Sequence, residues 1–156
     1  MKAAVRGAVE SDIAAILADL RPSDAAEMAA LGTTAEDAMR MGLSMSDWAM
    51  TGTLDGEPVC MFGVAPQNYL LGFGTPWMLA TTRIESSQVA FLRACRPVVQ
   101  RMLETYPSLS NVVHADNAMA IRWLRWLGFT FHINANGSPA TFVVNDEPFH
   151  LFAMGS

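Results

Sequence analysis

The segment VVHADNAMAIRWLRWLGF, residues 112–129, gives the clearest structural signal in the chain. Its apolar start predicts a strand over Asn111 to Asp116. Asn117 then stands in a favoured N-cap position, and apolar residues at helical spacing predict a helix from Ala118 to Leu127. Gly128 follows where helices commonly end in a left-handed conformation. The segment therefore predicts a strand, a capped helix and a further strand in direct succession.

Shorter elements are predicted on both sides of this segment. Ser11 is expected to cap an amphipathic helix that follows a strand at residues 3–9, and the box at Thr34 is expected to open another helix over Ala38 to Leu43. The other predicted elements are a helix at 23–31, a hairpin of strands at 48–53 and 59–64 that turns at Asp55-Gly56, a strand at 76–82, a helix capped by Ser86 and Ser87 that runs to Tyr106 with a kink at Pro97, and strands at 129–133, within 140–144 and at 149–154.

The order of these elements and the size of the chain define the fold class. The chain has 156 residues, of which 51% are hydrophobic and 16% are charged, which is enough for one well-buried core without disulfides or metal. A strand, two or three helices, three strands, a helix, a strand, a helix and final strands do not alternate regularly. We therefore predict one α+β domain over residues 1–156, with a central sheet flanked by helices, and not a Rossmann fold.

Charge and composition exclude several functional classes. The net charge of −5 has the wrong sign for broad binding to nucleic acid. Cys60 and Cys95 are not in a CxxC pair, and His114, His132 and His150 lack metal-ligand spacing, so we expect buried reduced thiols and no metal site.

The chain also lacks the features of a targeting or membrane segment. Charged residues at positions 6, 10 and 12 interrupt the start of the sequence before an apolar stretch develops. The uncharged run from Pro58 to Thr82 is divided by prolines, glycines and the Gln67-Asn68 pair into pieces of five to eight residues, the length of buried strands. We therefore expect a cytoplasmic protein with no membrane span.

Positive charge is concentrated in one part of this acidic chain. Residues 83–125 contain six arginines and three acidic residues, whereas the rest contains four basic and twelve acidic residues. Such a region can hold a small anionic ligand, such as a phosphate-bearing cofactor, without attracting polymers. A solvated helix face would give the same charge pattern, so both interpretations stay open.

The strand, Asn, helix and Gly-Phe pattern of residues 112–129 resembles the signature of the Gcn5-related N-acetyltransferase (GNAT) superfamily, in which Asn, Ala-Ile and Leu-Gly-Phe recur at this spacing. Residues 5–13 resemble its first strand and helix start, and Asp55-Gly56 lies where its second and third strands join. The segments 74–79, 121–129 and 148–150 are also similar to a GNAT-like or internal virion protein A family of tailed bacteriophages. The resemblance implies a GNAT-like acyl-CoA N-acyltransferase fold with a mixed, mostly antiparallel sheet.

The resemblance implies a site for acetyl-CoA between two splayed strands. Leu79, Ala80 and Thr81 would supply the strand edge that pairs with the pantetheine arm. The pyrophosphate would rest on the N-terminus of the next helix, where free amides favour anions. The implied phosphate-binding and cleft residues are Arg83, Ser86, Ser87, Gln88 and Asn117.

Two departures from the superfamily pattern concern this chemistry. The usual glycine-rich phosphate loop is replaced by Ile84-Glu85-Ser86-Ser87, in which Glu85 would repel phosphate, so Ser86 and Ser87 could equally be simple helix caps. Leu124 stands where the superfamily carries a tyrosine that protonates the leaving thiolate. His114 is then the best available base, because its strand leads directly to Asn117 and its ordinary pKa lies near neutrality.

Aromatic and methionine residues suggest where the acceptor would bind. Trp77 is a candidate pocket wall and Trp48 a second candidate substrate contact, although core packing explains both tryptophans equally well. Five methionines between residues 27 and 50 suit a core, a mobile lid or a partner-binding surface.

Two functional hypotheses follow. The first is an acyl-CoA-dependent N-acyltransferase that acts by direct transfer to a small-molecule or protein amine. The second is a catalytically silent phage protein on the same fold, which acts as a virion component or binds a host factor, in the host cytoplasm or in the virion. A homo-oligomer is compatible with either hypothesis, and the fold alone does not decide between them.

Overall fold

The computed structural model describes residues 2–155 and places every strand in one sheet of eight strands. The strands are β1 (Ala3–Gly7), β2 (Trp48–Leu54), β3 (Glu57–Asn68), β4 (Phe73–Ala80), β5 (Ser108–His114), β6 (Thr130–Phe131), β7 (Phe142–Val144) and β8 (Glu147–Gly155). The helices are α1 (Ser11–Leu17), α2 (Pro22–Ala30), α3 (Ala35–Met45), α4 (Gln88–Thr105) and α5 (Ala118–Leu127), with a 3₁₀ turn η1 (Thr82–Ser87) before α4.

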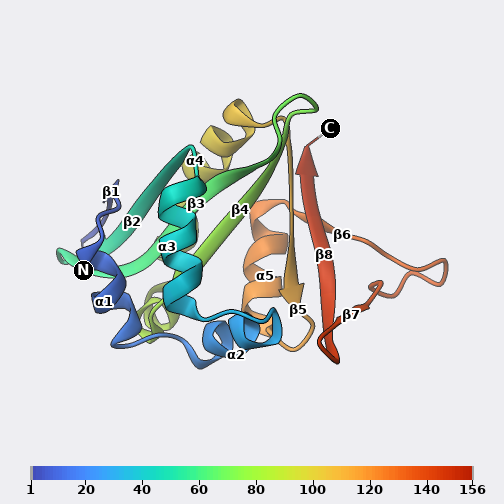
Figure 1. Ribbon diagram of the computed structural model, residues 1–156, viewed down its shortest axis with the longest axis horizontal. Helices are drawn as coiled ribbons and strands as arrows, with labels where there is room; N and C mark the ends of the chain where they lie inside the picture. The colour runs from blue at the N-terminus through green and yellow to red at the C-terminus, as the bar shows by residue number, and fades with distance from the viewer. Residues whose placement is uncertain (1, 156) are drawn as a thin grey trace.

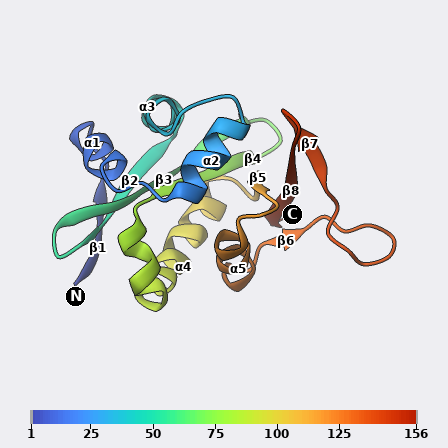
Figure 2. The same ribbon diagram turned by 90° about the horizontal axis from the view of Figure 1, so that it is seen from below.

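The sheet is mixed and mostly antiparallel. Its strand order is β1-β2-β3-β4-β5-β8-β6, with β7 paired to β8, and β4 with β5 is the parallel pair. Helices cover both faces: α1, α2 and α3 lie on one side and α4 and α5 on the other (Figures 1 and 2). The predicted α+β class and the mixed, mostly antiparallel sheet flanked by helices are confirmed.

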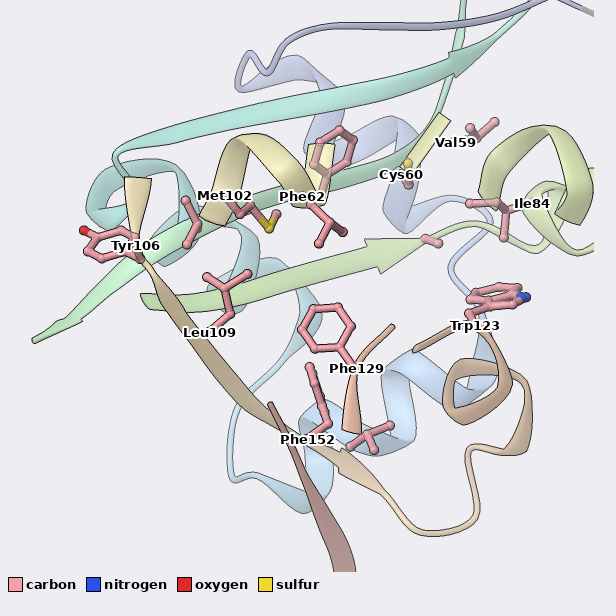
Figure 3. Packing of buried hydrophobic residues seen from close by; sticks show 14 of the residues in the cluster. Val59, Cys60, Phe62, Ile84, Met102, Tyr106, Leu109, Trp123, Phe129 and Phe152 are labelled. Carbon is pink, nitrogen blue, oxygen red and sulfur yellow. The ribbon is translucent and has the colours of Figure 1, made fainter. Parts of the chain in front are cut away.

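Each face of the sheet has its own hydrophobic core. The larger cluster joins the sheet to α4 and α5 and includes Phe62, Met102, Trp123, Phe129 and Phe152 (Figure 3). The rings of Phe129 and Phe152 meet edge to face with centroids 5.2 Å apart. A smaller cluster on the opposite face packs α1 and α3 against β3 and β4.

Local signals specified several element boundaries correctly. Thr34 caps α3 by accepting a hydrogen bond from the Asp37 amide, as the capping box predicts. Asp55 and Gly56 turn the β2–β3 hairpin with φ of 50° and 82°. Asn117 accepts the Ala120 amide at the start of α5, and Gly128 ends that helix with φ of 104°.

Three predicted helix caps are wrong. Ser11 is the first residue of α1, and Glu10 occupies the N-cap position without a side-chain capping bond. The Asp12 carboxylate accepts the Val9 amide at 3.0 Å just before the helix. The Ser86 hydroxyl donates back to the Arg83 carbonyl within η1, and Ser87 precedes α4 without a side-chain capping bond. The chain tightens into a 3₁₀ turn there, so α4 begins only at Gln88 and contains Pro97 inside it.

The parallel strands β4 and β5 pair only where both begin. Phe73 pairs with Ser108 and Gly74 with Leu109, and the ladder stops there. Figure 1 shows the two strands side by side at one end and apart at the other, where α2 lies. This divergence creates the groove in which the functional residues gather. Within residues 2–155, no helix is long and apolar enough to cross a membrane.

Candidate active site between strands β4 and β5

The groove is bordered by alternate backbone groups of β4. The Thr81 amide donates to the Val59 carbonyl of β3, so the odd-numbered residues of β4 face β3 and the even-numbered residues face the groove. Pro76, Met78 and Ala80 are therefore the residues whose peptide groups point toward β5. Asn111 of β5 bridges the groove at its narrow end, where its Nδ2 donates to the Pro76 carbonyl at 2.7 Å.

The wide end of the groove is covered by the segment that leads into α2. The Arg21 amide donates to the Ala80 carbonyl at 2.9 Å, and the Asp24 carboxylate accepts the Ala80 amide at 2.9 Å. The Thr82 amide also donates to the Asp19 carbonyl at 2.9 Å. The predicted strand edge at Leu79 to Thr81 is thus not open: Leu79 and Thr81 face β3, and Ala80 is bonded to this segment.

Met78 is the part of the edge that remains open. Its N–H and C=O face the groove, and neither has a hydrogen-bond partner among residues 2–155. Met78 lies between the Asn111 bridge and the Asp24 contact and lines the cavity described below. A groove-facing amide of this kind can donate to a ligand carbonyl.

A second carboxylate of α2 reaches the opposite strand. Glu27 accepts the His114 backbone amide at 2.7 Å, so α2 spans the groove with Asp24 on β4 and Glu27 on β5. Arg21 is buried at the start of α2, pairs with Asp24 at 3.0 Å, and its guanidinium carbon lies 5.0 Å from the centre of the Trp123 ring.

Burial shifts the titration of both carboxyl groups upward. Desolvation raises the pKa of Asp24 to about 6, although the Arg21 guanidinium and the Ala80 amide oppose the shift. Desolvation also raises the pKa of Glu27, opposed by hydrogen bonds from the His114 amide and the Asn117 side chain. A carboxyl group with a raised pKa can act as a general base near neutral pH.

A cavity of about 250 Å³ adjoins the groove. It is lined by Arg21, Asp24 and Glu27 at the groove and mostly by aliphatic and aromatic side chains of the sheet, α4 and α5 elsewhere. The cavity therefore combines a few polar groups with an extended apolar wall, as small-molecule sites do.

The start of α4 holds the predicted phosphate-binding residues. The Ser87 hydroxyl is buried without a hydrogen-bond partner. Ser87 is among the residues that line both the main cavity and a smaller hollow around the first turn of α4. The Gln88 side chain is already used, because it donates to the Glu85 carbonyl and accepts from the Trp123 indole at 3.0 Å. The Ser86 hydroxyl donates to the Arg83 backbone carbonyl, and of Arg83, Ser86 and Ser87 it is Ser87 that lines the main cavity.

His114, predicted as the base, has both ring nitrogens engaged. Its Nδ1 accepts the Asp116 amide at 3.0 Å, and its Nε2 lies 3.5 Å from the Glu147 carboxylate. The ring packs edge-on against Phe149 and is not among the residues that line the cavity. A neutral imidazole bonded in this way carries its proton on Nε2 and has no free lone pair for an amine.

The two predicted substrate-contacting tryptophans lie in different places. Trp77 lines the cavity, donates to the Ser46 hydroxyl at 2.7 Å and packs closely on Gly42 of α3. Trp48 instead packs beneath Arg101 of α4, 4.4 Å from the ring centre, and is outside the cavity lining. The structure therefore places Trp77, and not Trp48, at the candidate site.

Asn117 and Leu124, two residues singled out in the sequence, belong to α5 and to the turn before it. Asn117 is buried at the start of this helix and lines the cavity, and Leu124 lines it about two turns later. Neither Tyr69 nor Tyr106 lines the cavity, so among residues 2–155 no tyrosine faces it. Residues 2–155 also contain no group of three or more His, Cys, Asp or Glu side chains that could bind a metal ion.

Sequence reasoning missed four groups that the fold brings to the groove. These are Arg21, Asp24, Glu27 and the Met78 backbone. The spacing of three residues between Arg21, Asp24 and Glu27 places them along one side of a helix, which is the signal that could have indicated a shared contact.

Comparisons with known proteins agree on the fold. No family model matches the sequence, and no curated protein matches it either. Among solved structures, the ribosomal-protein-S18-alanine N-acetyltransferase from Escherichia coli is similar with a TM-score of 0.68 at 14% identity, over 99% of this chain and 94% of that one. An acetyltransferase of the GNAT family from Streptococcus pneumoniae is similar with a TM-score of 0.62 at 12% identity, over 99% of this chain and 100% of that one.

A third similar structure was solved with a ligand. The aminoglycoside acetyltransferase AAC(6')-Ib in complex with coenzyme A gives a TM-score of 0.66 at 14% identity, over 99% of this chain and 95% of that one. These likenesses show that the chain has the GNAT acyl-CoA N-acyltransferase fold.

Proposed function

We propose that this protein is an acyl-CoA-dependent N-acyltransferase that transfers the acyl group directly to an amine. The observation that carries the proposal is the divergence of β4 from β5, which leaves the Met78 peptide group facing a groove beside the cavity. The shared fold with N-acetyltransferases supports the reaction class. A bound acyl-CoA would supply an activated thioester, with acetyl-CoA as the simplest donor.

The residues at the groove suit such a donor with one obstacle. Ser87 and the first amides of α4 would hold phosphate oxygens, and the buried, unpartnered Ser87 hydroxyl fits that role. The Met78 amide would donate to the thioester carbonyl, where negative charge develops during acyl transfer. The obstacle is Asp24, which already occupies the Ala80 amide.

Glu27 is the better-placed base for the amine. Its carboxylate lines the cavity, and burial raises its pKa toward the working range of a general base. His114 remains the alternative base predicted from the sequence, but it would first have to release the Asp116 amide. Leu124 cannot protonate a leaving thiolate, so solvent would supply that proton.

Paired variants test the proposal. Calorimetric titration with coenzyme A should give a Kd that Ser87→Ala raises about tenfold and Ser86→Ala leaves unchanged, because only Ser87 faces the cavity. Thiol release from acetyl-CoA with a panel of amines should be lost in Glu27→Gln and retained in His114→Gln. Equal affinities of both serine variants and the parent, or no thiol release with any amine, would refute the proposal.

A catalytically silent protein of this fold is the second candidate function. The bonds from Arg21 and Asp24 to Ala80 favour it, because they use the strand edge within the chain itself. Such a protein would act as a virion component or through a host-factor partner, and the exposed Leu70 at the β3–β4 turn, 97% accessible, offers an apolar contact for it. If the stably folded parent protein does not bind coenzyme A, this second candidate is the correct one.

A further inference from the structure

We infer that the acyl donor carries a medium-length hydrocarbon chain, which is seated in the part of the cavity beneath α4. This inference rests on the proposed acyltransferase function and specifies its donor. It is carried by the extent, the lining and the size of the cavity.

The cavity extends much further than the groove requires. A thioester arm in the groove needs only the space between β4 and β5. The cavity lining continues under α4 past β3 and β2 to Ala4 of β1 in one direction, and to Phe152 of β8 in the other. A ligand confined to the groove would leave these extensions unfilled.

The extension toward β1 is lined almost entirely by carbon and sulfur. Its walls include Leu54, Val59 and Cys60 from the sheet and Cys95 and Val99 from α4. Burial raises the pKa of both thiols to about 12, so they remain neutral and present an apolar surface. The charged groups of the cavity, Arg21 and the two α2 carboxylates, are all at the groove. The lining therefore suits an uncharged hydrocarbon chain and not a sugar, a nucleotide or a second phosphate.

Cavity size sets the length of the chain. An apolar cavity of about 150 Å³ binds benzene, a molecule of six carbons. By the same proportion, the whole cavity of about 250 Å³, the groove and its extensions together, holds about ten carbons, which is the upper limit for a chain seated beneath α4. An acetyl group would fill only a small part of this space, whereas a longer acyl chain, up to about eight carbons, would extend beneath α4.

A series of saturated acyl-CoA thioesters tests this assignment in the full-length protein. Calorimetric titrations with coenzyme A and with acetyl-, butanoyl-, hexanoyl- and octanoyl-CoA should show Kd falling about three- to fourfold per added methylene, as expected for burial of each group. Cys95→Phe should remove this gain for octanoyl-CoA and leave the Kd of acetyl-CoA unchanged. Gln100→Phe places the same ring on the exposed side of α4 and is the matched control.

The outcomes separate the two proposals. If acetyl-CoA binds and octanoyl-CoA binds no more tightly, the chain assignment is wrong and the acyltransferase proposal stands. If the chain-length gain persists in Cys95→Phe, the chain lies elsewhere and the assignment to this cavity is wrong. If none of the thioesters nor coenzyme A binds, the acyltransferase proposal itself fails. Ala94 lines the same cavity, and Ala94→Leu replaces Cys95→Phe if that variant does not fold.

Discussion

Replacing Asp24 with alanine will tighten the binding of coenzyme A. The Asp24 carboxylate accepts the Ala80 amide at 2.9 Å, so a ligand that pairs with this part of β4 must displace it. A hydrogen bond to a charged group contributes about 1.5–3 kcal/mol. Because about 1.4 kcal/mol corresponds to a tenfold change, the variant should lower Kd by about 10- to 100-fold in a calorimetric titration.

The same variant will be less stable than the parent. Asp24 is the partner of the buried Arg21 guanidinium, and removal of one partner from a buried ion pair costs about 3–5 kcal/mol. The double variant Arg21→Met, Asp24→Ala removes both charges and should regain most of that loss in urea unfolding. Because the double variant also lacks the Asp24 carboxylate but keeps most of the stability, a change in its affinity for coenzyme A reports on the groove and not on a general loss of structure.

The charge of Asp24 also makes its effect depend on pH. Burial raises the pKa of Asp24 to about 6, so the carboxyl is mostly neutral at pH 5 and charged at pH 7.5. A neutral carboxyl is a weaker acceptor for the Ala80 amide, so the affinity gain of Asp24→Ala should shrink at pH 5. Asp24→Asn keeps an acceptor oxygen and should resemble the parent at pH 5. An unchanged or weaker affinity of Asp24→Ala at pH 7.5 would refute this account of the groove.

Three further variants test the scaffold around the groove. Asp12→Ala should lose about 3 kcal/mol in urea unfolding at pH 7, and the loss should fade as pH falls from about 4 to 2, because the Arg6 bonds lower the pKa of Asp12 to about 2 and stabilise only its charged form. Gly42→Ala should lose about 1 kcal/mol by thermal unfolding, since its methyl group would lie 2.7 Å from Trp77 Cε2 and overpacking outweighs the gain in helix propensity. Asn117→Ala should lose about 1 kcal/mol of stability with its cap, and an unchanged melting temperature would contradict this.

The sequence predicted best where the structure depends on neighbouring residues. Asn117 caps α5 and Gly128 ends it because a side-chain acceptor and a glycine act within one turn of the chain. The Asp55-Gly56 turn is correct for the same reason. Ser87 was predicted either to bind phosphate or to cap the helix. Its hydroxyl makes no capping bond, is buried without a partner, and follows the turn η1.

The site was harder to predict because its geometry is set by contacts between distant residues. Which β4 amides face the groove depends on the register with β3, in which Thr81 pairs with Val59. Asp24 and Glu27 are ordinary surface carboxylates by sequence pattern, and only the passage of α2 across the groove brings them to β4 and β5. His114 appeared available because the sequence does not show that Asp116 and Glu147 approach its ring.

The distribution of unpartnered polar atoms bears on whether the groove binds a ligand. Buried side-chain atoms without a hydrogen-bond partner are rare, because each one loses its bonds to water without replacement. Among residues 2–155, Arg21 Nε and Ser87 Oγ are two such atoms, and both belong to residues that line the cavity. Both atoms can donate a hydrogen bond, so a ligand with acceptor oxygens, such as a phosphate ester or an amide, would satisfy both. Two unpaired donors in residues that line one cavity therefore favour a cavity that binds a ligand.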